Sequence, residues 1–293
     1  MNYELVAVHD GNFHSDDVFA IAVLKLIHPK LKYIRSRDQE KLSKVDARID
    51  VGFSYDPRKG NFDHHQKEGA GKRENNIPYA AIGLIWKQFG KELVSQDWIF
   101  ECIDKKLIQH LDAHDNGLKT FSVKDIEPYK IDDAINALNP QWPDESNSNK
   151  SFKEAVKFAM LILKGEINKA EGMNKARNTV LKTIKESKSK DYIILNEFVP
   201  FKEVATLETK LKFVVYYDKE KENWRLRTVE KDINGFAPRK PLPKEWAGLE
   251  NEELAKVTCI KDVIFSHKNR ITIVAKSKES ILKLLDLALK YKE

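Results

Sequence analysis

The sequence predicts an α/β protein of two domains, in which a parallel sheet with helices on both faces precedes a helical connector and a smaller α+β domain. Three observations predict this fold class. The chain has 293 residues, more than the ~100–150 residues around which single domains cluster. Short β-type runs alternate with helical segments in its first part, as in a parallel sheet. A stretch rich in Asn, Pro and Ser, residues 139–150, then precedes a long helical segment and several β-type runs.

We therefore place the first domain at residues 1–140, the helical connector at 141–190 and the α+β domain at 191–293.

The composition is that of a globular protein with an ordinary core. The chain is 41% hydrophobic and 33% charged, which excludes a disordered or low-complexity protein. No apolar run approaches the ~18 residues of a membrane span, and the first residues lack a signal-peptide pattern, so we expect a cytoplasmic protein. Cys102 and Cys259 have no CxxC partner, which excludes a thiolate zinc site. The net charge of +6 is compatible with a nucleic-acid or phosphate substrate.

The first domain is expected to begin with a strand, a loop and a helix. Residues 3–8, YELVAV, are a β-type run. The helix after the loop is expected to have Ser15 as its N-cap, with Asp16 and Asp17 in the first turn, where carboxylates suit the helix dipole. A short polar segment that can hold a small helix separates the next two expected strands, residues 31–36 and 47–52.

A polar loop and two helices are expected to complete this domain. The loop spans residues 53–76 and contains FDHHQ. Pro78 and Gly90 mark the start and the end of the helix that follows, because proline suits the first helical turn and glycine the position after the last one. A second helix is expected at residues 97–113 from its apolar spacing.

The rest of the chain reads as a helical segment followed by strands. Residues 151–190 contain no proline, although Gly165 and Gly172 could divide them into two helices. Four β-type runs and a closing amphipathic helix follow, and we interpret them as an α+β domain with antiparallel strands. The runs are residues 191–201, 212–219, 223–230 and 271–276, and the helix is residues 278–292.

Histidine and aspartate recur where the predicted elements of the first domain end. Loops at the carboxyl ends of parallel strands meet at one edge of a sheet. Imidazole and carboxylate without thiolate suit Mn²⁺, Mg²⁺, Co²⁺ or Zn²⁺, and one carboxylate can bridge two ions ~3.5–4 Å apart. The clusters are His9 with His14 and Asp16, then Asp50, then Asp63-His64-His65, and finally Asp112 with His114 and Asp115.

Each cluster has an ordinary structural interpretation when it is taken alone. A single histidine at a strand end is more often a satisfied polar residue than a ligand. Asp16 could be a first-turn carboxylate, and Asp50 could cap a turn. The combination of an HxD, a DVG strand end and a DHH triplet in this order favours a metal site.

These motifs resemble those of a known family. The HxD, IDVG, DHH and the Asp of LDAHDNG look like the motifs of the DHH phosphoesterase superfamily. HDGNFHSDD, FDHHQ, IPYAAIGLIWKQFG, HLDAHDNG and RKPLPKEWAGL more closely resemble the melanocyte-proliferating-gene (MYG) exonuclease family, from about residue 5 to residue 290. The resemblance implies a DHH phosphoesterase domain that hydrolyses phosphodiesters with bound metal ions.

The resemblance also implies roles for individual residues. His65 would touch the scissile phosphate or its leaving oxygen, and Asp16 and Asp50 would take part in catalysis through the metals. Asp115 is favoured over Asp112 as the fourth-motif ligand, because DNG occupies the place of the DT or DTG of other superfamily members. The implied ligand set is His9, His14, Asp16, Asp50, His64 and Asp115 or Asp112.

In the second domain the resemblance points to a substrate-binding segment. Arg239 and Lys240 are candidates to bind phosphate, and His267 is a further candidate. PRKPLP could instead be only a rigid, solvated turn. The sequence departs from the family at residues 259–260, where CI replaces the usual GI, which leaves the substrate contacts there open.

Three functions follow as hypotheses. The first is a 3′-5′ exonuclease on RNA or single-stranded nucleic acid, with two divalent ions, Mn²⁺ as the expected ion and Mg²⁺ or Co²⁺ as alternatives. The second is a DHH-type phosphatase or pyrophosphatase on small phosphates, and the third is a nucleic-acid or metal-binding module without turnover. A single strand needs stacking aromatics and a basic channel. Under the first hypothesis one groove is expected to contain Trp224, Trp246, Arg225, Arg227 and Arg239.

Overall fold

The computed structural model describes residues 3–119, 128–142 and 147–293. The chain divides into two compact units, Met1–Glu171 and Gly172–Glu293, and each unit is described by itself. The polar connection expected at residues 139–150 includes 143–146, which lie outside the described residues. The three-part division expected from the sequence stays a prediction. In the described part of the chain, no helix combines the length and the apolar character that crossing a membrane requires.

The first unit contains a five-stranded sheet in the order β2-β1-β3-β5-β4. Neighbours from β2 to β5 pair in parallel, as predicted, whereas β4 pairs antiparallel with β5 at the edge. β4 and β5 lie in the segment expected to be a polar loop, and each is too short for a period-two pattern to reveal. The strands are β1 Leu5–Val8, β2 Lys32–Arg35, β3 Ala47–Ile49, β4 Tyr55–Asp56 and β5 Asn61–Phe62.

Most helices of this unit lie where they were predicted, but a helix at Ile131–Asn136 was not expected. The helix expected to start at Pro78 begins at Ala81, and two further corrections concern the first helix and the segment 97–113. The N-cap of the first helix is His14, not Ser15, and its N–H donates to the Asp17 carboxylate at 3.0 Å. The helix expected at residues 97–113 is interrupted by a π-helical turn, Asp104–Ile108. The α-helices are α1 Ser15–Ile27, α2 Gln39–Leu42, α3 Ala81–Phe89, α4 Asp97–Ile103, α5 Gln109–Asp115 and α6 Ile131–Asn136, with 3-10 turns at Pro57–Lys59 and Gly90–Leu93.

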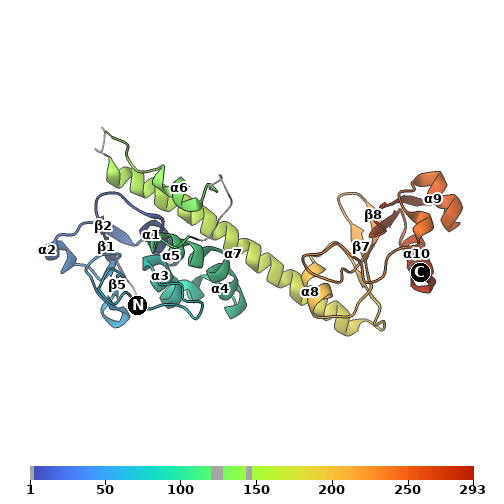
Figure 1. Ribbon diagram of the computed structural model, residues 1–293, viewed down its shortest axis with the longest axis horizontal. Coiled ribbons are helices and arrows are strands. Elements are labelled where there is room, and N and C mark those ends of the chain that lie inside the picture. The colour runs from blue at the N-terminus through green and yellow to red at the C-terminus, as the bar shows by residue number, and fades with distance from the viewer. Residues whose placement is uncertain (1–2, 120–127, 143–146) are drawn as a thin grey trace. The chain divides into compact units, whose positions relative to one another are not determined.

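The two faces of this sheet are covered unequally. Val6 and Val8 of β1 belong to the main core, which α1 and α3 complete by packing against each other (Figure 1). Ala7 points the opposite way, as strand alternation requires, and joins a small cluster with Leu42 of α2 and Val51. Because β1, β3 and β5 pair in parallel, their carboxyl ends lie at the same edge of the sheet, and α1 follows β1 from that edge.

A single long helix, α7 Ser148–Glu186, passes from the first unit into the second (Figure 1). Gly165 and Gly172, which could have divided this segment into two helices, do not interrupt it. An internal glycine costs a helix about 1 kcal/mol relative to alanine, which weakens it without ending it. Phe152 and Leu163 of α7 belong to the core of the first unit, and Val180 belongs to a core of the second.

The second unit contains a five-stranded sheet in the order β6-β7-β8-β10-β9. The predicted antiparallel pairing is confirmed except between β6 and β7, which pair in parallel. A parallel pair needs a crossover connection, and α8 Lys202–Leu207 lies in it. β9 was not expected as a strand. The remaining elements are β6 Tyr192–Leu195, β7 Phe213–Asp218, β8 Asn223–Thr228, a 3-10 turn Lys244–Trp246, α9 Asn251–Thr258, β9 Val263–Ser266, β10 Thr272–Ala275 and α10 Lys278–Lys290.

Side chains alternate between two cores along the central strand of this sheet. Phe213 and Val215 of β7 pack with α10, whereas Val214 and Tyr216 pack with α8 and the end of α7. Both faces of β7 are therefore buried.

Candidate metal centre

Three parallel strands of the first unit end in the residues that the sequence analysis singled out. His9 follows β1, Asp50 follows β3, and His64 follows β5 by two residues. The Asp50 N–H donates to the Phe62 carbonyl at 3.0 Å, which continues the pairing of β3 with β5. Asp50 has a φ of 55°, a left-handed conformation that aspartate tolerates better than most residues. The sheet thus brings these three side chains to one edge.

Two helices bring further ligand-type side chains to the same edge. His14 and Asp16 lie at the start of α1, and Asp115 is the last residue of α5. Asp16 is completely buried, and its Oδ2 accepts a hydrogen bond from the N–H of Ala81, the first residue of α3, at 3.3 Å. The starts of two helices therefore meet at the Asp16 carboxylate.

His9, His14 and Asp50 form one group that could hold a metal ion, with ligand atoms within 4.8 Å of one another. His9 Nε2 lies 3.3 Å from Asp50 Oδ2. His9 Nδ1 lies 2.9 Å from the Asp10 carbonyl oxygen, and only a protonated nitrogen can donate to a carbonyl. This contact leaves Nε2 facing the group as the nitrogen that can bind a metal.

His64 is the centre of a second group. Its Nε2 lies 3.1 Å from Asp115 Oδ2, 3.3 Å from Asp50 Oδ1 and 3.9 Å from Asp16 Oδ2. Asp50 therefore presents one carboxylate oxygen to His9 and the other to His64. This is the arrangement of a carboxylate that bridges two metal ions.

The residues present fit divalent metal ions. Among the described residues, four buried atoms of these groups make no hydrogen bond despite the close contacts: His9 Nε2, Asp16 Oδ1, Asp50 Oδ1 and His64 Nε2. Buried polar atoms without partners are costly, and a cation among them would satisfy all four. Imidazole and carboxylate ligands suit Mn²⁺, Co²⁺ and Zn²⁺.

The pKa values of the metal-free groups reflect the crowding of carboxylates. Burial lowers the pKa of His9 and His64, but nearby carboxylates outweigh it and raise both to about 10. Burial and the neighbouring carboxylates of Asp50 and Asp115 raise the pKa of Asp16 well above its usual value. Burial also acts to raise the pKa of Asp50, but its histidine contacts dominate and lower it. The raised pKa values mean that His9, His64 and Asp16 bind protons readily in the metal-free protein, and a metal ion could take the place of these protons.

His65 lies at the exposed side of this cluster and is held by Asp63. The Asp63 carboxylate contacts His65 Nδ1 at 2.8 Å and accepts from the His65 N–H at 3.1 Å. His65 Nδ1 is also 3.4 Å from Asp50 Oδ1, while 52% of its side-chain surface stays exposed. His65 can therefore serve as a metal ligand with Asp50 and His64 or face a substrate.

Asp112 lies apart from these groups and holds the start of α3. Its Oδ1 accepts from the N–H groups of Ala80 and Gly83, both at 3.0 Å, and its Oδ2 is paired with Arg73. Arg73 also pairs with Asp104 at 2.9 Å. Of the two aspartates left open by the sequence, Asp115 is the one beside His64.

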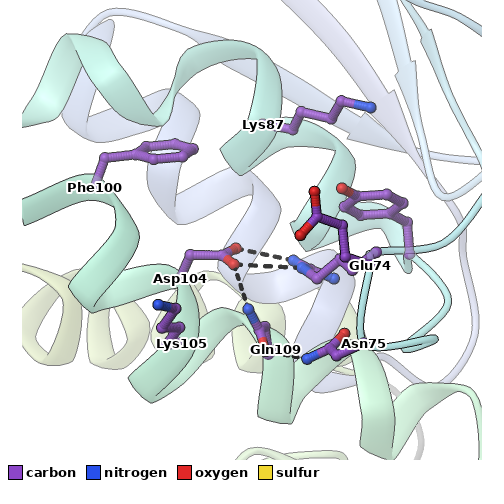
Figure 2. A pocket seen from close by; sticks show the side chains of 9 residues that line it. Glu74, Asn75, Lys87, Phe100, Asp104, Lys105 and Gln109 are labelled. Atoms are coloured by element: carbon purple, nitrogen blue, oxygen red, sulfur yellow. Dashed lines mark hydrogen bonds and ion pairs between the residues drawn. The ribbon is translucent and has the colours of Figure 1, made fainter. Parts of the chain in front are cut away.

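Arg73 and Asp104 line a pocket of about 400 Å³ next to this network. Figure 2 shows Asp104 next to Gln109 in the lining of the pocket, where the Gln109 amide donates to the Asp104 carboxylate at 2.7 Å. The Arg73 guanidinium also lies 4.4 Å from the centre of the Tyr79 ring. The guanidinium of Arg73 is thus already bound by two carboxylates and the Tyr79 ring, so it is not available to bind a phosphate in this pocket.

The substrate-binding candidates of the second unit have main-chain partners. The Arg239 guanidinium donates to the Leu211 carbonyl at 3.0 Å and the Ala205 carbonyl at 3.2 Å. The Lys240 ammonium donates to the Leu289 carbonyl at 2.8 Å, and His267 Nδ1 accepts from the Asn269 N–H at 3.0 Å. These contacts give all three side chains a structural role, and their proposed contact with substrate stays a prediction.

The groove expected from aromatic and basic residues needs one correction. Trp246 is buried in the core of the second unit, with 4% of its surface exposed, so it cannot stack on a base. Trp224 is partly exposed, and Lys278 lies 5.1 Å from its ring centre. Arg225 pairs with Asp218, and Arg227 pairs with Glu230.

The sequence analysis named Asp17 and Asp63 without giving them a supporting role in the centre, and it missed Arg73. Asp17 lies 3.0 Å from His9 Nε2, and Asp63 and Arg73 hold His65 and Asp112. Asp17 and Asp63 are adjacent to predicted ligands, which was the signal that could have indicated their role. No sequence pattern joins Arg73 to Asp112.

Comparisons with known proteins agree with the sequence motifs. Residues 5–289 match a family model, MYG1_exonuc, described as an uncharacterised protein family (UPF0160). The chain is 31% identical to the MYG1 protein of Dictyostelium discoideum, over 94% of each chain. It is 28% identical to the MYG1 protein of Saccharomyces cerevisiae, over 97% of this chain and 95% of that protein. It is also 28% identical to the MYG1 exonuclease of Homo sapiens, over 89% of this chain and 79% of that protein.

Proposed function

Because the chain belongs to the MYG1 exonuclease family, we propose that it is a divalent-metal-dependent 3′-5′ exonuclease acting on RNA or single-stranded nucleic acid. The exonuclease name of the human relative supports a nuclease-type hydrolase. We further propose that the first unit is a domain of the DHH phosphoesterase superfamily. The order of the His-x-Asp, Asp50 and Asp-His-His motifs along the strand ends supports that placement.

One observation carries the metal-dependent part of this proposal. Asp50 presents one carboxylate oxygen to His9 and the other to His64, at the edge where α1 and α5 contribute Asp16 and Asp115. Shared carboxylates of this kind are typical of sites that hold two divalent ions.

The residues divide into two sets for two ions. His9, His14 and Asp50 would hold one ion, and His64, Asp50, Asp16 and Asp115 would hold the other. Bound Mn²⁺ would supply Lewis acidity at the phosphate and make water a stronger acid near neutral pH. Mg²⁺ or Co²⁺ are the alternative ions.

His65 is positioned to act on the substrate. Asp63 fixes its Nδ1, which leaves Nε2 to donate a proton toward a phosphate or leaving oxygen. General acid catalysis of this kind contributes roughly 10²–10⁴-fold in rate. Asp63 raises the pKa of His65, which favours the protonated form of the ring.

The function can be tested with a 5′-labelled RNA oligonucleotide, its DNA counterpart and pyrophosphate. After chelation and addition of Mn²⁺, we expect RNA products that shorten from the 3′ end, and no cleavage before the metal is returned. Added salt should slow the reaction if basic side chains bind the phosphates, because binding then releases counterions.

Two outcomes would contradict the proposal. Rapid hydrolysis of pyrophosphate with intact oligonucleotides would identify a small-phosphate hydrolase instead. Binding of oligonucleotide or metal without hydrolysis of any of the three compounds would identify a binding protein.

A further inference from the structure

Phe53 is an aromatic residue exposed at the rim of the metal centre. It lies in the turn after β3 that begins with Asp50, and 73% of its surface is exposed. Its ring centre is 6.5 Å from that of His65, at an interplanar angle of 71°. The ring therefore stands beside the histidine that faces the substrate in the proposed function.

The backbone of Phe53 is held in a conformation that bulky residues rarely adopt. Its φ is 54°, in the left-handed region where a bulky L-residue is an outlier. Its N–H donates to Asp63 Oδ2 at 2.6 Å, and the other oxygen of that carboxylate contacts His65 Nδ1 at 2.8 Å. One buried carboxylate thus fixes both Phe53 and His65, and strain retained in this way is common at ligand sites.

Packing does not account for the phenylalanine. Exposed apolar residues are frequent on protein surfaces, but this one combines exposure with backbone strain and contact with the candidate site. It belongs to none of the hydrophobic clusters found among the described residues, whereas Val51 in the same turn is buried in one of them. Glycine at position 53 would satisfy the turn without strain.

We propose that Phe53 stacks against the base of the 3′-terminal nucleotide while its phosphodiester lies at the metal centre. This inference rests on the proposed exonuclease function and names the part of the substrate that the site recognises. Every base has a flat π face, so stacking on an aromatic ring tolerates any sequence. Pyrophosphate has no such face, so Phe53 would favour nucleotides over inorganic phosphates.

The experiment pairs a change in the protein with the matching change in the substrate. Phe53→Gly removes the ring and accepts the positive φ, and Phe53→Tyr keeps a ring. Each is assayed with Mn²⁺ on an oligonucleotide that ends in a normal 3′ nucleotide and on one that ends in a 3′ abasic sugar. We expect Phe53→Gly to lower kcat/KM on the normal end about tenfold and to leave the abasic end unchanged, while Phe53→Tyr stays near wild type on both.

A binding measurement gives an independent readout. An oligonucleotide with 2-aminopurine at its 3′ end should lose fluorescence on wild-type protein in Ca²⁺, and less on Phe53→Gly. Equal losses of kcat/KM on both ends would overturn the proposal, as would equal quenching by both proteins. If the wild type cleaves neither oligonucleotide, the exonuclease function fails, and the 2-aminopurine titration still decides whether Phe53 stacks on the base.

Discussion

Asp50 is the residue on which both metal-ligand groups depend. Its left-handed backbone and its hydrogen bond to Phe62 set the carboxylate between His9 and His64. A side chain that serves two ions cannot be replaced by a neutral amide without weakening both sites.

We predict that Asp50→Asn loses bound Mn²⁺ and nearly all turnover while the protein remains folded. Elemental analysis and hydrolysis of bis-(p-nitrophenyl) phosphate measure the two effects. Asp10→Asn is the matched control, because Asp10 is adjacent to His9 in sequence but its carboxylate pairs with Arg37 at the surface. An Asp50→Asn protein with normal metal content and rate would make Asp50 a structural residue.

His64 and His65 are adjacent in sequence, but we predict different consequences of replacing them. His64→Ala should lose metal, because its buried Nε2 contacts three carboxylates. His65→Ala should keep its metal and lose roughly 10²–10⁴-fold in rate, the range of general acid catalysis. Metal content and rate are measured on both variants, and equal metal loss in both would show that His65 is a ligand.

The sequence could predict which residue types gather here but not every contact. His9, Asp50 and His64 follow strands, and the topology of a parallel sheet is enough to place strand ends together. Asp112 and Asp115 are one helical turn apart on α5, so periodicity cannot choose between them. Their partners, Arg73 and His64, come from distant segments and became visible only in the fold.

Two aspartate side chains from other helices hold the start of α3. Asp112 accepts from its Ala80 and Gly83 N–H groups, and Asp16 accepts from Ala81. The contact between Asp112 and Gly83 also depends on glycine, because a Cβ at position 83 would clash with the Asp112 carboxylate.

We predict that Gly83→Ala weakens both folding and Mn²⁺ binding. The methyl group must displace the Asp112 carboxylate from Arg73, and breaking a buried ion pair costs about 3–5 kcal/mol. Urea unfolding measures the loss of stability, and Mn²⁺ titration followed by electron paramagnetic resonance measures metal affinity. Gly172→Ala is the control, since a Cβ there meets nothing within 4 Å and alanine suits a helix better. Unchanged Mn²⁺ affinity in Gly83→Ala would separate the start of α3 from the metal centre.

The contact between Asp262, just before β9, and the N-cap of α10 predicts that the stability of the protein depends on pH. Asp262 accepts from the Ser277 N–H at 3.0 Å, at the N-cap of α10. Burial acts to raise the pKa of Asp262, but the hydrogen bonds from Ser280 and Ser277 outweigh it and lower the pKa below 3.8. A lowered folded-state pKa gives stability that is present above the unfolded pKa and is lost as pH falls through the folded value.

We therefore expect wild type to be more stable than Asp262→Asn at pH 6, with the difference shrinking as the pH falls below 4. The difference between their free energies of unfolding, measured in urea at each pH, isolates this carboxylate from the others. A difference that does not change with pH would show that the ionised form of Asp262 is not favoured by folding.

The sequence predicted long helices and strands better than short ones. α10 shows its apolar spacing over several turns, whereas β4 and β5 have two residues each, and no pattern can form over that length. The parallel pairing of β6 with β7 was missed because the local sequence of a strand does not specify the direction of its neighbour.

Within the described part of the chain, the residues grouped as candidate metal ligands all belong to the first unit. They lie between His9 and Asp115, within Met1–Glu171. A ligand that binds only the folded form stabilises the part of the protein that contains its site.

We predict that Mn²⁺ raises the temperature of one calorimetric unfolding transition and leaves a second unchanged. The affected transition should reach its lowest temperature in chelator, and in Asp50→Asn it should no longer respond to Mn²⁺. A single transition that moves as one with Mn²⁺ would show that the two units unfold together.

The alternation of β7 between two cores has a consequence for how this family can change during evolution. Phe213 and Val215 face one core and Val214 and Tyr216 the other, so deleting one residue from the strand would exchange the two sets. Substitutions that keep apolar character can accumulate at these positions one at a time, but a change of length cannot. Gaps between aligned relatives should therefore avoid residues 213–218 and collect in the turn that follows, residues 219–222.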